Sequence, residues 1–222
     1  MIMINKLKHK LLAPALIAGI LISGSSTLFA AENSGSSTDK VWTQVFNGKD
    51  LDGWHTVPGG KWFVLDGQIV GIATKEEKRH GLLLSDKRYR DFHLRVEFMS
   101  ILGNSGLYFR TEKVEHAVGV KGFQAEITPT GFPAAGLYET LGRAWVVQSD
   151  KEQVNKLFKK NDWNIMEVLA VGGNIQVRLN GSQVCEVKDD TGRPEGHLGV
   201  QLHGSIDMDV RFRKVEIMEI AP

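Results

Sequence analysis

Polar side chains alternate with apolar ones in the segment GFQAEI, and their types suit proton transfer and hydrogen bonding. Gln124 and Glu126 stand between apolar residues at positions 123, 125 and 127. Because successive side chains of a strand point to opposite faces, we expect Gln124 and Glu126 on one face and the apolar side chains on the other. A carboxylate beside an amide can act as a general base or form hydrogen bonds to a ligand.

The segments GLYFRTE and HLGVQLHG repeat this alternation. The first presents Tyr108 and Arg110 on its polar face, and the second presents His197, Gln201 and His203. Any half-exposed sheet alternates in this way, so plain solvent exposure is one reading. Solvated faces usually carry Lys, Glu, Thr and Ser, however, so this set favours a binding or catalytic face.

Two neighbouring segments add candidates for ligand contacts. The loop ILGNSG carries Asn104 between glycines that allow close approach to a ligand. The segment GLYETLGR carries Tyr138, Glu139 and Arg143. For Arg143 the alternative is a salt bridge with Glu139, and for Tyr138 it is a buried ring with a satisfied hydroxyl group.

Several other kinds of site are disfavoured. No HExxH, phosphate-binding loop, GxSxG or Cys-His nucleophile motif occurs in the sequence. The single cysteine, Cys185, rules out an internal disulfide and a cysteine-based zinc site, and we expect a thiol in the core. His80, His93 and His116 are isolated in the sequence, and we expect them at the surface.

Period-two patterns and turn signals dominate the chain. Hairpin turns are predicted at Asp66-Gly67, Gly172-Gly173 and Asn180-Gly181, because Gly and Asn accept a positive φ. One helix is predicted in SDKEQVNKLFKKNDW, with Ser149 or Asp150 as its cap. Many short strands joined by glycine-rich turns predict an all-β sandwich or jelly roll.

Composition suits a globular protein that is exported. The chain has 222 residues, of which 42% are hydrophobic and 24% charged. Residues 1–30 combine a lysine-rich start, a short apolar stretch and a small-residue cleavage site, and they predict a signal peptide. Residues 31–40 are then a flexible leader and residues 41–222 a single domain, located in the periplasm or outside the cell.

Charge limits the classes of partner. The formal net charge of +1 offers no broad basic surface for nucleic acid, and no membrane contact is expected after signal cleavage. The sequence says nothing about the oligomeric state.

Several motifs, in order along the chain, carry a family resemblance: FNGKDLDGW, GNSGLYFR, GFQAEI, GLYE with GRAW, LNG, and GVQLHG with VRFRKVEI. They resemble the bacterial family of 3-keto-disaccharide hydrolases, also called 3-keto-glucoside lyase-hydratases. The resemblance implies a concanavalin-A-like, or laminarinase-like, β-jelly roll of two packed antiparallel sheets. It also implies a small carbohydrate substrate, a glucoside whose C3 hydroxyl has been oxidised to a ketone.

Such a substrate needs fewer catalytic groups than an ordinary glycoside. The ketone acidifies the C2 hydrogen, so one base can form an enolate that expels the C1 substituent, and water can then add to the product. On this basis we expect Glu126 or His203 to be the base and the other its partner or acid, while Arg110 or a divalent ion stabilises the enolate. No cofactor is certain, but Glu126 and His203 could hold such an ion. The expected sugar contacts are Asn104, Tyr108, Gln124, Tyr138, Glu139, Arg143 and Gln201.

Three other functions compete with this hypothesis. A noncatalytic carbohydrate-binding module has the same kind of fold and would bind sugar without turnover. An ordinary glycoside hydrolase would use Glu126 and Glu139 as its two carboxylates. A cell-surface adhesion domain would show neither activity.

Overall fold

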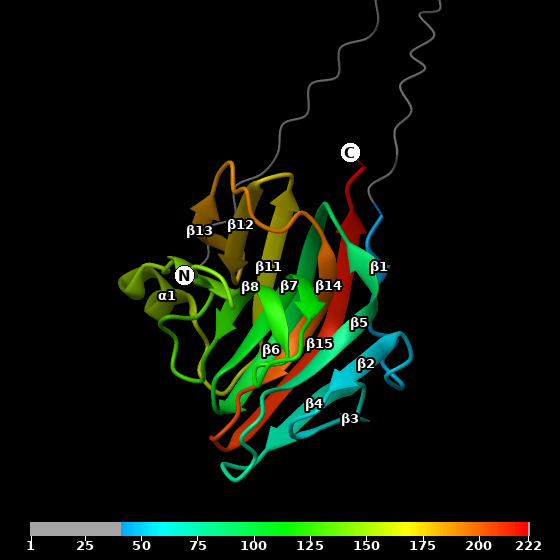
Figure 1. The fold of residues 1–222 in the computed structure, drawn as a ribbon. Helices are drawn as coiled ribbons and strands as arrows, with labels where there is room; N and C mark the ends of the chain where they lie inside the picture. The colour runs from blue at the N-terminus through cyan, green and yellow to red at the C-terminus, as the bar shows by residue number, and fades with distance from the viewer. Residues whose placement is uncertain (1–40, 222) are drawn as a thin grey trace, which may run out of the picture. The chain divides into compact units, whose positions relative to one another are not determined.

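Two antiparallel sheets and one short helix form the part of the chain that the computed structural model describes, residues 41–221. The sheets stack face to face (Figure 1). This arrangement confirms the predicted all-β sandwich. The expected signal peptide and leader lie outside the described residues. Within residues 41–221, no helix is long and apolar enough to span a membrane.

The larger sheet has the strand order β13-β12-β11-β6-β15-β4-β3, and β1 pairs with β15 beside this path. Its strands are β1 (Thr43–Gln44), β3 (Lys61–Leu65), β4 (Gln68–Ala73), β6 (Phe92–Leu102), β11 (Asn164–Val171), β12 (Asn174–Leu179), β13 (Ser182–Val187) and β15 (Met208–Glu219).

The smaller sheet has the order β10-β9-β8-β7-β14-β5-β2, and it carries the polar segments singled out above. Its strands are β2 (Trp54–Val57), β5 (Gly81–Tyr89), β7 (Ser105–Lys113), β8 (Val120–Ile127), β9 (Leu137–Thr140), β10 (Ala144–Val147) and β14 (Gly196–Leu202). β14 lies between β5 and β7, so segments far apart in sequence become neighbours.

The core lies between the two sheets and is built from their inward-facing apolar side chains. Phe98 and Phe212 of the larger sheet and Phe109 and Phe123 of the smaller one are fully buried in it. Phe109 and Phe123 stack across neighbouring strands with ring centroids 5.5 Å apart. Cys185 is buried in the same core with a free thiol, as expected.

The predicted turns and helix are confirmed. Asp66 and Gly67 have φ values of 49° and 73°, and they join β3 to β4 as a tight hairpin. Helix α1 (Lys151–Leu157) begins after Asp150, whose side chain accepts a hydrogen bond from the backbone N–H of Gln153 at 2.8 Å. The helix is shorter than its predicted segment, because Phe158 already has an extended backbone.

Candidate active site

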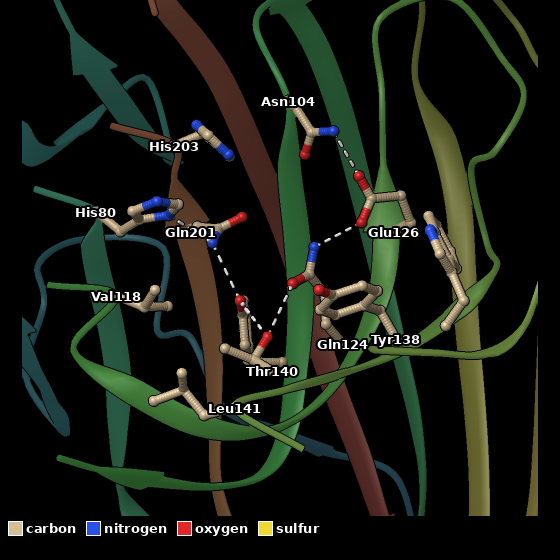
Figure 2. Close-up of a pocket in the computed structure, with 12 residues that line it drawn as sticks. His80, Asn104, Val118, Gln124, Glu126, Tyr138, Thr140, Leu141, Gln201 and His203 are labelled. Carbon is tan, nitrogen blue, oxygen red and sulfur yellow. Dashed lines mark hydrogen bonds between the residues drawn. The ribbon is translucent and has the colours of Figure 1, made fainter. Parts of the chain in front are cut away.

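A pocket of about 290 Å³ opens on the outer face of the smaller sheet, the face turned away from the core (Figure 2). Seven residues predicted for the site line it: Asn104, Tyr108, Gln124, Glu126, Tyr138, Gln201 and His203. They come from β7, β8, β9 and β14 and from the loops beside these strands. The alternation of side chains therefore placed these residues on the expected face.

The polar face is buried rather than solvated. Tyr108, Gln124, Glu126 and Gln201 are exposed by only 1%, 5%, 6% and 3%. An ordinary wet face would leave such side chains open to water. Plain solvent exposure is therefore wrong for this set of residues.

Glu126 lies at the centre of this polar set. Its Oε1 accepts a hydrogen bond from Asn104 Nδ2 at 2.5 Å, and its Oε2 accepts one from Gln124 Nε2 at 2.7 Å. Burial raises the pKa of Glu126 to about 7, although both hydrogen bonds favour the ionised form and oppose that rise. A carboxyl group with this pKa can take up and release a proton near neutral pH.

A directional chain of hydrogen bonds leads across the sheet to this carboxylate (Figure 2). Gln201 Nε2 donates to the hydroxyl of Tyr108 at 3.0 Å, and that hydroxyl lies 3.0 Å from Thr140 Oγ1. Thr140 donates to Gln124 Oε1 at 3.4 Å, and Gln124 donates in turn to Glu126. Each donor polarises the next, so the network holds the Glu126 carboxylate in a fixed orientation.

Two histidines face each other at the other side of the pocket. The rings of His80 and His203 have centroids 4.3 Å apart. His203 Nδ1 lies 2.8 Å from the carbonyl oxygen of Gly204, which can only accept, so Nδ1 carries the proton and Nε2 is free to accept another. His80 Nδ1 lies 3.0 Å from Gln201 Nε2, which can only donate, so the proton of His80 is on Nε2.

His80 was expected to be an isolated surface residue, whereas it is half-buried and lines the pocket beside His203. The residue immediately precedes β5, and the pairing of β5 with β14 brings it beside His203. Burial, together with the nearby His203 and His116, lowers the pKa of His80 to about 4, so its ring is neutral at pH 7. No local sequence signal marks His80, because only this long-range strand pairing brings it into the pocket.

An aromatic pair lies at the β9–β10 side of the pocket. The rings of Tyr138 and Trp145 meet edge to face with centroids 5.3 Å apart, and Trp145 is 37% exposed. Sequence analysis missed Trp145, Thr140, Leu141 and Val118 as lining residues. The motif GRAW contained Trp145, but nothing in its spacing showed that its ring would reach the pocket.

Arg110 is not in the pocket, which corrects its expected role beside the enolate. Arg110 and Thr111 form a bulge opposite Gly122, and Arg110 has a φ of 48°. The extra residue breaks the alternation of β7 and turns Arg110 away. Its guanidinium group binds Asp91 Oδ1 at 3.0 Å and the carbonyl oxygens of Arg90 and Gly172 at 2.9 and 2.7 Å.

Glu139 and Arg143 also lie outside the pocket, so their expected sugar contacts find no support there. Glu139 follows Tyr138 on β9 and therefore points to the opposite face. Its carboxylate forms a salt bridge with Arg143, which is the alternative that the sequence analysis gave for Arg143. Arg143 NH1 also binds Asp190 Oδ2 at 2.8 Å. His197 likewise lies elsewhere, with Nδ1 2.7 Å from the carbonyl oxygen of Ser85.

The metal hypothesis finds no complete ligand set. Within residues 41–221, no three His, Cys, Asp or Glu side chains are grouped so that they could hold an ion. Glu126 is instead bonded to two amide groups, and His203 to a backbone carbonyl. We therefore assign no chemical step to a metal.

Comparison with protein families shows what the chain that forms this fold and pocket is similar to. Residues 41–218 match the model of the 3-keto-alpha-glucoside-1,2-lyase-like domain. The chain belongs to this family. The match confirms the resemblance drawn from the sequence motifs and covers both sheets. No curated protein matches the chain.

Solved structures similar to this family member share its fold. One is described as a "putative glycosyl hydrolase" from Parabacteroides distasonis, with 21% identity, a TM-score of 0.61, and coverage of 81% of this chain and 94% of that one. Another is the carbohydrate-binding module CBM66 from Bacillus subtilis, with 18% identity, a TM-score of 0.58, and coverage of 75% and 96%. A third, from the same species and described as galectin-like in fold, has 12% identity, a TM-score of 0.60, and coverage of 81% and 98%. These likenesses establish the jelly-roll fold.

Proposed function

We propose that the protein cleaves 3-keto-glucosides or 3-keto-disaccharides by removing the C2 proton and eliminating the C1 substituent. Family membership supports a carbohydrate-active enzyme, and the pocket favours this particular chemistry. The observation that carries the proposal is a single buried carboxylate, Glu126, whose pKa is about 7.

A single carboxylate favours elimination over ordinary glycoside hydrolysis. Hydrolysis of an unactivated glycoside generally uses two carboxyl groups on either side of the scissile bond. Among the described residues that line the pocket, Glu126 is the only acidic one, and Glu139 pairs with Arg143 instead. A 3-keto sugar removes the need for a second carboxylate, because its ketone acidifies the C2 hydrogen.

The proposed reaction balances with one base. Ionised Glu126 takes the proton from C2, and the electron pair of that C–H bond forms the enolate of the C3 ketone. The enolate then re-forms the ketone, makes a C1=C2 double bond and expels the C1 oxygen with its bonding pair. The leaving group takes up a proton and departs as an alcohol, and water can later add across the double bond.

The other pocket groups fit supporting roles in this reaction. His203 has an unprotonated Nε2 when neutral and can accept a proton there, so its protonated form can serve as the acid for the leaving group. The second N–H of Asn104 Nδ2 and the Nε2–H of His80 are donors available to the enolate oxygen. In this proposal neutral N–H groups stabilise the enolate oxygen, a role for which the sequence had suggested the guanidinium group of Arg110.

Product analysis on matched substrates tests the proposal. Purified protein is incubated with a methyl 3-keto-glucoside and with the same glucoside unoxidised, and products are followed by NMR. We expect turnover of the oxidised sugar alone, with a product unsaturated at C1–C2 or its hydrate. Cleavage of the unoxidised glucoside at a similar rate would contradict the proposal and favour an ordinary hydrolase.

A carbohydrate-binding module is the second candidate. The Tyr138–Trp145 pair favours it, because exposed aromatic rings are common platforms for sugars. Such a module would bind the 3-keto-glucoside without forming any product in the same NMR experiment.

A further inference from the structure

The hairpin between β9 and β10 contributes an apolar wall to the pocket, formed by the side chains of Leu141 and Trp145. Both side chains are partly exposed. β10 is the edge strand of the smaller sheet, and its neighbour in the strand order is β9. The sheet therefore holds this wall from one side only.

The turn of the hairpin has a demanding backbone. Leu141 and Ala144 have φ values of 53° and 62°, in the left-handed region that residues with a side chain adopt only where their surroundings hold them. Gly142 lies close against Glu139, since a Cβ atom at position 142 would come within 2.5 Å of Glu139 Cδ. Contacts beyond the turn itself must therefore stabilise its position.

Arg143 supplies such contacts by joining two carboxylates. Its backbone N–H donates to Glu139 Oε2 at 3.3 Å, and its side-chain Nε donates to the same oxygen. Its NH1 donates to Asp190 Oδ2 at 2.8 Å. One guanidinium group thus connects the hairpin to the loop between β13 and β14, and we call Glu139, Arg143 and Asp190 the clamp.

The far end of the clamp is fixed in the body of the protein. The Asp190 side chain is only 3% exposed, and its Oδ1 accepts the backbone N–H of Gly192 at 2.7 Å. The backbone N–H of Asp190 donates to the carbonyl oxygen of Gly173 at 2.9 Å, in the turn between β11 and β12 of the larger sheet. An exposed ion pair contributes little to stability, but a carboxylate buried this deeply needs its charged partner. The clamp therefore ties the pocket wall to the larger sheet.

The clamp acts on the pocket from behind the wall. Arg143 Cζ lies 5.8 Å from the centroid of the Phe123 ring, which is buried in the core. Trp145 pairs with Tyr138 across the two strands, and both residues line the pocket. The carboxylate of Glu126 is held by the amide groups described above and not by the clamp. The clamp can thus change how the wall meets a ligand without touching the reacting atoms.

We propose that Arg143 is a positioning residue, which acts through the β9–β10 hairpin and sets the place of Leu141 and Trp145 against the sugar ring. A sugar ring presents C–H groups on its faces, and an indole ring beside a leucine side chain suits such a face. The inference rests on the proposed function for the identity of the ligand. It assigns Arg143 to substrate affinity and leaves the chemical step to Glu126.

Steady-state kinetics on methyl 3-keto-glucoside separate affinity from chemistry. We expect Arg143→Met to raise KM at least about tenfold and to leave kcat within about twofold of wild type. Arg143→Lys keeps the positive charge but cannot span both carboxylates, so it should recover part of the lost affinity. Arg88→Met is the matched control, because Arg88 pairs with Glu195 on the same loop as Asp190 and should leave KM unchanged.

A double-mutant cycle tests whether the effect passes through the wall. Where Leu141 and Trp145 are both replaced by alanine, adding Arg143→Met should raise KM by less than about twofold, because the wall that it positions is gone. A full tenfold effect in this background would overturn the positioning role, and so would an unchanged KM in Arg143→Met alone. A fall in kcat without a change in KM would also overturn it, since Arg143 would then act on the chemical step.

Calorimetry separates this inference from the proposed function. In Glu126→Gln protein, Arg143→Met should weaken the binding of methyl 3-keto-glucoside about tenfold, whether or not the wild type turns the sugar over. Weaker binding without wild-type turnover would support the positioning role and contradict the elimination chemistry. Unchanged binding would overturn the positioning role, and no binding to wild type or Glu126→Gln would overturn both. If Arg143→Met does not fold, Asp190→Asn replaces it and should weaken binding about threefold, and unchanged binding would again overturn the positioning role.

Discussion

At the scale of single residues, the environment of Glu126 defines the chemistry of the pocket. Burial raises its pKa to about 7, while Asn104 and Gln124 hold both carboxylate oxygens. The pair of polar residues in GFQAEI was predictable, because alternation in a strand fixes which side chains share a face. The depth of their burial was not, because it depends on β9, β10 and loops distant in sequence.

The pKa of Glu126 predicts an acid limb in the pH profile. Glu126 must be ionised to accept the C2 proton, so kcat/KM on a 3-keto-glucoside should fall tenfold per pH unit below about pH 7. Steady-state kinetics between pH 5 and pH 9 measure this limb. A flat profile from pH 5 upward would show that a different group is the base.

The hydrogen bond from Asn104 should help to set the pH below which kcat/KM falls. This hydrogen bond favours ionised Glu126, so Asn104→Ala should raise the pKa of Glu126 and move the acid limb to higher pH. Thr140→Val is the matched control, because Thr140 reaches Glu126 only through Gln124 and should move the limb less. An acid limb that stays in place in Asn104→Ala would contradict the role of this hydrogen bond.

At the scale of elements, a bulge in β7 separates one correct site prediction from one incorrect one. Tyr108 comes before the bulge and lines the pocket, whereas Arg110 lies in it and points elsewhere. A bulge adds one residue to a strand and reverses the alternation beyond it, and GLYFRTE carries no glycine at position 110 to announce it. Turns such as Asp66-Gly67 were predicted correctly, because their residue types accept the positive φ that the turn requires and so mark it in the sequence.

Arg110 should matter for stability and not for turnover. Replacing it by Met leaves Asp91 and two carbonyl groups without their buried partner, which typically costs about 3–5 kcal/mol. Urea denaturation measures this loss, and kcat per folded molecule should stay near the wild-type value. Arg88→Met is the control, since its exposed pair with Glu195 should contribute less than about 1 kcal/mol. A folded Arg110→Met protein without activity would contradict this prediction and show that Arg110 takes part in catalysis.

At the scale of the whole molecule, the two-sheet fold and the family were both predictable from the sequence, because hairpin signals and ordered motifs extend along the chain. The second cavity of about 310 Å³, which shares His80 with the pocket, was not predictable, because it forms where the loop before β5 meets the loop after β7. Contacts between such distant segments leave no periodic trace in the sequence.

The buried Glu126 should make the stability of the molecule depend on pH. Its pKa is higher in the folded chain, about 7, than the ordinary 4.5 of an unfolded chain, so the stability linked to its proton is fully present below about pH 4.5 and is lost as the pH rises through 7. Glu126→Gln avoids this loss and should be more stable than wild type by about 3 kcal/mol at pH 8. Urea denaturation at pH 4.5 and pH 8 tests this, since the advantage should be small at the lower pH. The titration of His80 acts in both proteins and cancels in the comparison.

Export is a separate prediction for the whole chain. The basic start and apolar stretch of residues 1–30 should direct secretion, with cleavage after Ala30. Mass spectrometry of the protein from a periplasmic or culture fraction should then find a chain that begins at Ala31. An intact N-terminus retained in the cytoplasm would contradict this prediction.

The most direct test of the central claim is the turnover of a 3-keto-glucoside by Glu126→Gln at pH 8. This change keeps the shape of the side chain and removes its ability to accept the C2 proton, so we predict at least a ~100-fold loss of turnover. Circular dichroism confirms that the variant is folded. A folded Glu126→Gln protein that works at the wild-type rate would contradict the account.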